Sequence, residues 1–320
     1  MKIKVLDRSA MGFDLSFESL SEFGEVEIYD NTSKEELCDR IADAEILVIN
    51  KIKMNAEALR SAPMLKLVCV FATGYDNVDI MTARELGIAV CNVPAYSTDS
   101  VTLFTVSNVL YLYSHLAEYQ RHVTSGKYTL LGKANAITPI YHELRGKTWG
   151  IIGFGNIGQS VAKVAEAFGC NILVNKRTAT DGYRCVDIDT LCKESDIITI
   201  HCPLNESSYH LINEEKINLM KPDVIIVNEA RGAVIDEEAV ANAVLSGRIS
   251  AFGSDVYSVE PFDKKHPFTK IMGLDNVCLT PHSAWGAIEA RERCLGVIYS
   301  NINGYLSGNV VNRVDIIKQN

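Results

Sequence analysis

Residues 148–158 read TWGIIGFGNIG, and this stretch decides the fold. It opens with an apolar, β-rich run, passes through three glycines at the spacing GxGxxG, and continues into a helical pattern over residues 159–168. Strand, glycine turn and helix in this order are the context in which the motif binds a dinucleotide. A tight turn that binds nothing remains the alternative.

Each position of the turn has a reason in such a site. Gly153 permits the tight turn, Gly155 admits a pyrophosphate to bare backbone, and Gly158 lets helix and strand pack closely. The N-terminus of the helix that follows would then face the phosphates with its partial positive charge.

The strand after this helix ends at Asn175 in a basic sequence. An acid that holds the ribose 2′-hydroxyl is expected about 20 residues after the turn. Lys176, which is 18 residues after Gly158, stands there instead, and Arg177 and Thr178 follow. Two cations and a hydroxyl suit a 2′-phosphate better than a neutral ribose. The sequence therefore predicts NADP(H) as the preferred cofactor, with NAD(H) possible, and a solvated basic strand end is the alternative.

Short apolar runs alternate with helical stretches on both sides of the turn. The runs typical of parallel strands buried on both faces are residues 3–7, 45–49, 66–71, 148–152, 171–175, 197–200, 224–228, 250–254 and 276–280. One amphipathic stretch between them, residues 33–41, begins with a capping box made by Ser33 and Glu36. The helical stretch Val101–Tyr113 is apolar almost all round, which indicates burial between two lobes or against a second subunit.

A polar, proline-containing joint at residues 93–100 and a long helical pattern over residues 287–305 divide the chain. We expect an α/β protein with two Rossmann-like or flavodoxin-like open parallel-sheet domains. A dinucleotide-binding domain, residues 99–286, would be inserted in a split substrate-binding domain made of residues 1–98 plus 287–320.

Three successive strand ends carry Arg231, Glu260 and His282. In open α/β sheets, ligands bind outside the carboxyl ends of the strands. A guanidinium grips a carboxylate bidentately, and an imidazole, which titrates near pH ~6.5, delivers a proton at neutral pH, the more so beside a carboxylate. Each residue alone has an ordinary structural explanation. Together they are the groups that reduction of a 2-keto acid needs.

Composition and charge exclude other classes. A chain of 320 residues that is 47% hydrophobic can bury the cores of two lobes. The net charge of -9 argues against a general nucleic-acid or anionic-membrane binder. No apolar run approaches the ~18 residues of a membrane span. The first seven residues read as a strand rather than a signal peptide, so a cytoplasmic location is expected.

Nine cysteines invite a metal or disulfide interpretation. No pair has CxxC spacing, the count is odd, and most lie among apolar neighbours, so reduced and mostly buried thiols are expected. His201 beside Cys202 is the only suggestive doublet, and two adjacent residues cannot build a tetrahedral zinc site. No metal is expected.

Over nearly all of its length the chain resembles the D-isomer-specific 2-hydroxyacid dehydrogenase family. The segments that carry the resemblance are FATGYDNVD (71–79), NVPAYST (92–98), the glycine turn, HCPL (201–204), NEARG (228–232), DVYSVEP (255–261) and TPH (280–282). Residues 50–51, 94–99 and 282–285 look most like the glycerate dehydrogenase/hydroxypyruvate reductase branch. Residues 102–104 and 131–141 depart from that branch.

The resemblance implies reduction of a small 2-keto acid, similar to hydroxypyruvate or glyoxylate, to the D-2-hydroxy acid. His282 would donate the proton with Glu260 as its acidic partner, and Arg231 would bind the substrate carboxylate and carbonyl. The implied substrate-binding residues are Lys51, Thr73, Gly74 and Arg231. The implied cofactor-binding residues are Gly153, Gly155, Asn156, Ile157, Gly158, Asn175, Lys176, Arg177, Thr178, Cys202, Pro203, Glu229, Ala230, Asp255 and His282, with Asp255 orienting the nicotinamide carboxamide.

Two other functions remain open on this fold. One is a formate dehydrogenase. Sites of that kind resemble this one but have Gln, not Glu, as the partner of the histidine, so Glu260 counts against that chemistry. A dinucleotide-sensing, corepressor-like binding protein could retain all three residues. The expected partners are a small 2-keto or 2-hydroxy acid and a second copy of the chain, with no nucleic acid and no membrane. We expect a homodimer built on Val101–Tyr113, and burial of this helix between the two lobes of one chain is the alternative.

Overall fold

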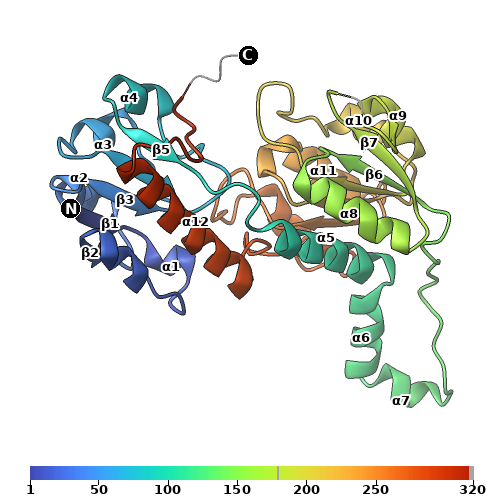
Figure 1. Cartoon of the computed structure of the whole chain (residues 1–320). Coiled ribbons are helices and arrows are strands. Elements are labelled where there is room, and N and C mark those ends of the chain that lie inside the picture. Colours follow the sequence, from blue (N-terminus) through green and yellow to red (C-terminus); the bar gives the residue numbers. More distant parts are fainter. Residues whose placement is uncertain (179, 317–320) are drawn as a thin grey trace. The chain divides into compact units, whose positions relative to one another are not determined.

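The computed structural model describes residues 1–178 and 180–316. It divides into two compact units, which are Met1–Ser97 with Gly286–Asn320 (unit 1) and Thr98–Trp285 (unit 2). Each unit contains one sheet whose paired strands all run parallel, with helices on its faces (Figure 1). The expected α/β class with two open parallel sheets is confirmed.

Unit 1 has a five-stranded sheet of order β2-β1-β3-β4-β5. Its strands are β1 (Lys2–Val5), β2 (Glu25–Ile28), β3 (Ile46–Ile49), β4 (Leu67–Val70) and β5 (Ala89–Cys91). The central strands β3 and β4 are buried along their whole length, which explains their unbroken apolar sequences. The sequence predicted β1, β3 and β4 but neither β2, a half-exposed edge strand, nor β5.

The helices of unit 1 cover both faces of this sheet. They are α1 (Arg8–Met11), η1 (Glu18–Phe23), α2 (Lys34–Ile41), α3 (Ala56–Arg60), α4 (Ile80–Glu85) and α12 (Ile288–Leu306). The predicted capping box is present at α2, where Ser33 accepts from Glu36 N and Glu36 accepts from Ser33 N. The distant helix α12 packs on β4, and Asn301 donates from Nδ2 to the carbonyl of Asn92 at 3.0 Å.

Unit 2 has a seven-stranded sheet of order β12-β11-β10-β9-β6-β7-β8. Its strands are β6 (Thr148–Ile152), β7 (Asn171–Asn175), β8 (Arg184–Cys185), β9 (Ile197–Ile200), β10 (Ile225–Asn228), β11 (Ala251–Ser254) and β12 (Val277–Leu279). Each predicted strand is present, and only the two-residue β8 was not predicted. The strand order reverses direction between β6 and β9, which is where dinucleotides bind in such sheets.

The helices of unit 2 include one that explains an apolar stretch of the sequence. They are α5 (Thr98–Tyr113), α6 (Leu116–Thr124), α7 (Lys127–Leu131), α8 (Asn156–Ala167), α9 (Ile188–Glu194), α10 (Glu214–Leu219), η2 (Gly232–Val234), α11 (Glu237–Leu245) and η3 (Pro267–Lys270). Helix α5 packs against α8, β10 and β11, and its Val109 and Leu112 join the core around Trp149. The apolar character of α5 thus follows from burial inside unit 2, a packing that was not predicted from the sequence.

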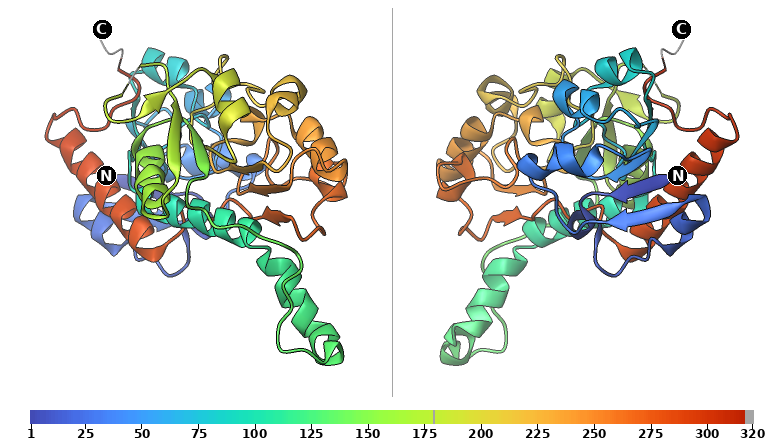
Figure 2. Two further views of the ribbon diagram at one scale, coloured as in Figure 1. Left: turned by 90° about the vertical axis from the view of Figure 1, so that its right-hand side faces the viewer. Right: turned by 90° about the vertical axis from the view of Figure 1, so that its left-hand side faces the viewer.

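Helices α6 and α7 project from the rest of unit 2 (Figure 2). Neither helix contains a buried residue. On these helices and in the chain that follows them, Leu130, Ile137 and Ile140 are 87%, 80% and 76% exposed. We call residues 116–141 the arm, and its apolar surface has no cover within the described part of the chain.

All nine cysteines are free thiols in the structure, and five of them are buried. Among the described residues, no group of three His, Cys, Asp or Glu side chains is placed to hold a metal ion. Nor is any helix of the described chain long and apolar enough to cross a membrane.

Candidate active site

Arg231, Glu260 and His282 follow three neighbouring strands of the unit 2 sheet. Strands β10 and β11 pair with Asn228 opposite Ser254, and β11 and β12 pair with Ser254 opposite Leu279. Because the strands are parallel and in register, the three chain segments that follow them leave from the same edge of the sheet. The predicted convergence of these strand ends is therefore present.

The imidazole of His282 and the carboxylate of Glu260 are in direct contact. His282 Nδ1 lies 2.6 Å from Glu260 Oε2, and the two side chains are 23% and 28% exposed. A carboxylate only accepts hydrogen bonds, so Nδ1 carries a proton in this pair. Nε2 is then the ring nitrogen that can exchange a proton with a substrate.

A buried aspartate organises the loop that carries His282. Asp255 Oδ1 accepts from Thr280 Oγ1 at 2.6 Å and from Ser283 N at 2.9 Å, and Oδ2 accepts from Ala284 N at 2.8 Å. Trp285 also donates from Nε1 to the His282 carbonyl at 2.9 Å. His282 itself has a φ of 52°, in the left-handed region that few non-glycine residues adopt. These contacts hold the imidazole in a defined place.

Arg231 is half-buried in the loop after β10. Its Nη1 donates to the Ala230 carbonyl at 2.8 Å, and Asn228 donates from Nδ2 to the Arg231 carbonyl at 3.0 Å. The next residue, Gly232, has no room for a side chain, because a Cβ there would lie 2.0 Å from the Tyr257 carbonyl carbon. The Arg231 loop therefore packs directly on the loop that carries Glu260.

Glu229 is a buried acid between these elements, only 8% exposed. Its Oε1 accepts from Asn108 Nδ2 at 2.9 Å, whereas its Oε2 has no partner among the described residues. Burial, and secondarily the charge of Asp255, raises the pKa of the Glu229 carboxyl to about 8. From the sequence, Glu229 was predicted only as a cofactor contact, although a lone acid at the end of an apolar strand is a signal of an unusual carboxyl group.

The glycine turn has the shape that its sequence predicts. A Cβ on Gly153 would lie 2.5 Å from Cys202 N, and one on Gly158 would lie 2.3 Å from the Gly153 carbonyl oxygen. A Cβ on Gly155 would meet no atom within 4 Å. Gly155 is also the N-cap of α8, and no side chain caps that end. The bare backbone and the first-turn N–H groups therefore fit an anionic pyrophosphate.

The basic sequence after β7 lies beside this turn. Gly153 N donates to the Asn175 carbonyl at 3.0 Å, and Asn175 Nδ2 donates to the Val186 carbonyl at 3.0 Å. Lys176, Arg177 and Thr178 then follow as exposed residues. Within the described chain, neither cation has an ion-pair partner, so both charges are available to an anion.

His201 and Cys202 lie against the glycine turn from the neighbouring strand end. Both ring nitrogens of His201 are buried without a hydrogen-bond partner in the described chain, and burial lowers the pKa of this ring to about 3. Burial also raises the pKa of the Cys202 thiol to about 11. Both side chains are therefore uncharged at neutral pH, which suits apolar walls. Pro203 follows them as an exposed residue.

The remaining predicted residues belong to unit 1, where they follow strands β3 and β4. Lys51 N donates to the Asp7 carboxylate at 2.6 Å, and Thr73 Oγ1 donates to the Val93 carbonyl at 2.8 Å. Asp7 was not predicted, and burial raises the pKa of its carboxyl. These contacts fix the backbone of both loops, including Thr73 and the adjacent Gly74.

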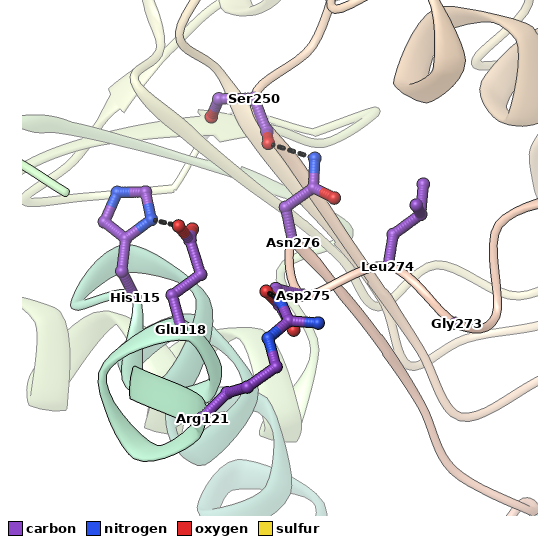
Figure 3. A pocket seen from close by; sticks show the side chains of 8 residues that line it. All are labelled: His115, Glu118, Arg121, Ser250, Gly273, Leu274, Asp275 and Asn276. Carbon is purple, nitrogen blue, oxygen red and sulfur yellow. Dashed lines mark hydrogen bonds and ion pairs between the residues drawn. The ribbon is translucent and has the colours of Figure 1, made fainter. Parts of the chain in front are cut away.

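A surface pocket of unit 2 lies away from this chemistry (Figure 3). Its lining residues are His115, Glu118, Arg121, Ser250, Gly273, Leu274, Asp275 and Asn276. Ser250 and Asn276 immediately precede β11 and β12, so the pocket is at the amino ends of the strands. Ligands of open α/β sheets bind at the opposite, carboxyl ends.

A dinucleotide turn and an Arg–Glu–His set, both at strand ends of one parallel sheet, are the features of an NAD(P)-dependent oxidoreductase. The family model described as D-isomer specific 2-hydroxyacid dehydrogenase, NAD binding domain, matches residues 106–284. The chain belongs to this D-isomer-specific 2-hydroxyacid dehydrogenase family.

Individual relatives support the same family over the whole chain. The hydroxypyruvate reductase of Blautia hydrogenotrophica is 37% identical over 328 residues, which cover 98% of this chain and 100% of that protein. The glyoxylate reductase of Thermococcus onnurineus is 36% identical over 302 residues, covering 91% and 89%. Among solved structures, an acyclic imino acid reductase in complex with NADPH and D-Arg is similar, with a TM-score of 0.86, 31% identity and coverage of 98% and 100%.

Proposed function

We propose that this enzyme uses NAD(P)H to reduce a small 2-keto acid, similar to hydroxypyruvate or glyoxylate, to the D-2-hydroxy acid, with His282 as the proton donor. The observation that carries the proposal is the 2.6 Å contact between His282 Nδ1 and Glu260 Oε2 at the strand edge that also carries Arg231. The names of the hydroxypyruvate and glyoxylate reductases among its relatives support the substrate class.

The three side chains divide the work. The Arg231 guanidinium binds the carboxylate and polarises the carbonyl, which its planar fork of donors suits. His282 delivers a proton from Nε2 to the carbonyl oxygen as that oxygen becomes negative. Glu260 holds the proton on Nδ1 and stabilises the charged ring until delivery. A bound nicotinamide dinucleotide supplies the hydride.

Unit 2 is the proposed dinucleotide-binding domain. The turn from Gly153 to Gly158 holds the pyrophosphate, and the side chains after β7 hold the adenosine ribose. We propose a preference for NADPH, since Lys176 and Arg177 are exposed cations without ion-pair partners in the described chain. The remaining proposed contacts on the cofactor come from Cys202, Pro203, Glu229, Ala230 and Asp255.

Unit 1 is the proposed substrate-binding domain. Backbone around Thr73 and Gly74 holds the far carboxylate oxygen of the substrate, and Lys51 adds a positive charge. The support for this assignment is local, because both loops are held by hydrogen bonds to neighbouring segments of unit 1. Attracting the single negative charge of a small 2-keto acid is the role expected of such a charge.

We propose a homodimer whose contact surface is the arm, residues 116–141. The helix named from the sequence, Val101–Tyr113, finds its apolar partners inside unit 2. The arm instead exposes Leu130, Ile137 and Ile140. An apolar surface of this kind is typical of an interface rather than of a monomer in water.

A spectrophotometric assay tests the catalytic proposal. NADPH and NADH oxidation is measured with hydroxypyruvate, glyoxylate and larger 2-keto acids, with and without added amines, and NADP⁺ reduction is measured with formate. We expect turnover of a 2-keto acid without amine. Turnover only with amine would favour imine reduction, as in the NADPH-bound structural relative. Turnover of formate, or dinucleotide binding with no turnover at all, would contradict the proposal.

A further inference from the structure

A buried carboxylate outside the predicted site lies under the loop that carries Glu260. Glu237 is the first residue of α11 and is 8% exposed. Its Oε1 accepts from Ser258 N at 2.8 Å, and its Oε2 accepts from Ser258 Oγ. Both oxygens therefore hold the residue two positions before Glu260. The helix N-terminus favours the negative charge at this place.

His266 completes this arrangement with a defined tautomer. Its Nε2 lies 3.0 Å from Glu237 Oε2, and its Nδ1 accepts from Phe268 N at 3.2 Å. A nitrogen that accepts a hydrogen bond carries no proton, so the ring is neutral and Nε2 is the donor to Glu237. The ring also stacks on Phe262, with centroids 4.6 Å apart. His266 therefore holds the same Glu237 oxygen that accepts from Ser258 Oγ.

The loop is held on its other side as well. The backbone of Tyr257 and Ser258 presses on Gly232, where no side chain fits. Tyr257 OH donates to the Thr280 carbonyl at 2.7 Å, and Tyr257 N donates to Glu260 Oε1 at 3.1 Å. A continuous chain of contacts thus leads from Glu237 through Ser258 and Tyr257 to Glu260.

We infer that Glu237 is a positioning residue for proton delivery: by clamping Ser258, with His266 behind it, it holds Glu260 against His282. The inference rests on the proposed function, in which Glu260 supports His282. It adds Glu237 and His266 to the groups that set the reaction rate. Glu260 itself lies on the surface and needs this clamp, because a hydrogen bond weakens steeply when its distance and angle change.

The experiment compares Glu237→Gln with Glu238→Gln in kcat, KM and pH dependence. In Glu237→Gln an amide NH₂ replaces one acceptor, so it faces either the Ser258 N–H or the two donors Ser258 Oγ and His266 Nε2. We expect kcat to fall about tenfold, which is less than the ~10²–10⁴-fold contribution of a general acid–base group itself, because Glu237 acts indirectly. The alkaline limb of the kcat profile should move to lower pH. The dissociation constant for NADPH should stay within twofold. Glu238 is exposed and paired with Lys270, so Glu238→Gln should match the wild type.

Ser258→Ala is the second variant. It removes one hydroxyl from an exposed residue and leaves the buried charge of Glu237 in place. A smaller change in the same direction is expected. Circular dichroism and thermal unfolding of each variant check that the fold is retained. An unchanged pH profile in both folded variants would overturn the inference.

A double-mutant cycle separates this inference from the proposed function. Glu260→Gln alone should move the alkaline limb to lower pH, and adding Glu237→Gln should then change kcat by less than twofold, because coupled residues are not additive. If Glu237→Gln costs the same factor in both backgrounds, Glu237 does not act through Glu260 and the inference is wrong while the proton-donor assignment stands. If Glu260→Gln leaves the alkaline limb in place, that assignment fails, and the inference fails with it.

Discussion

Asn108 on α5 donates from Nδ2 to Oε1 of Glu229, 2.9 Å away, inside the core of unit 2. Asn108 Oδ1 and Glu229 Oε2 both lack a partner within the described chain. A buried carboxylate oxygen without a donor disfavours the charged form of Glu229, and protonation of the carboxyl removes that cost. The raised pKa of Glu229, about 8, agrees with this hydrogen-bond count.

The first prediction concerns stability and pH. The pKa of Glu229 rises from an ordinary 4.5 to about 8 in the folded protein. Between these values the folded state binds a proton that the unfolded state has released, so stability falls as pH rises from about 5 to about 8. At about 1.4 kcal/mol for each pH unit, the loss is on the order of 3–5 kcal/mol. Glu229→Gln should remove most of it. Urea unfolding at pH 5 and pH 8.5 measures the difference, and parallel pH dependences of variant and wild type would contradict the assignment.

The second prediction concerns the proposed catalytic residues His282 and Arg231. His282→Ala should lower kcat by about 10²–10⁴-fold, which is the usual contribution of general acid–base catalysis. Arg231→Ala should also raise KM, and Arg231→Lys should fail as well because an ammonium has no bidentate geometry. Cofactor dissociation constants from fluorescence should stay near the wild-type value. A His282→Ala rate within threefold of the wild type would rule out His282 as the proton donor.

The third prediction concerns cofactor choice. The wild type should have a higher kcat/KM with NADPH than with NADH, by roughly tenfold, since charge-assisted hydrogen bonds at an exposed strand end are partly screened. Changing Lys176→Asp together with Arg177→Ala should reverse the order. Lys193→Asp, which makes the same Lys→Asp change at another exposed lysine of unit 2, is the control and should leave the preference unchanged. A wild type that prefers NADH would show that the two cations only interact with solvent.

The fourth prediction concerns the oligomer. The wild type should scatter light as a dimer of about twice the 35.3 kDa chain mass. Changing Ile137→Asp and Ile140→Asp on the arm should yield a monomer. Leu103 on α5 is 63% exposed, and Leu103→Asp should leave the dimer intact. A monomer with Leu103→Asp and a dimer with the arm variant would place the interface on α5, as the sequence analysis expected.

Local patterns predicted much of this structure. The runs 148–152, 171–175 and 197–200 became β6, β7 and β9 with identical bounds, because strands buried on both faces are apolar throughout. Strand β2 was not predicted, since its sequence EVEI belongs to a half-exposed edge. Helix α5 was predicted as a helix, but residue types alone do not tell which apolar surface will cover it.

In the site, too, some residues could be predicted from local sequence patterns and others could not. Arg231, Glu260 and His282 were predicted because each follows a recognisable strand. Glu237 and His266 were not, because their contact joins residues 29 positions apart and depends on how two loops pack. The burial of Glu229 likewise depends on α5, which comes 121 residues earlier where Asn108 lies.

The split of unit 1 also fixes an order of events during synthesis. Helix α12 contributes Ala290, Cys294 and Ile298, all fully buried, yet the ribosome adds them after the whole of Thr98–Trp285. The part of the chain that is made first is therefore the part that is finished last. In a nascent chain that ends at residue 285, all strands of both sheets have been synthesised, but the unit 1 sheet still lacks helix α12. The apolar face that this helix covers stays accessible to chaperones until about 20 more residues emerge.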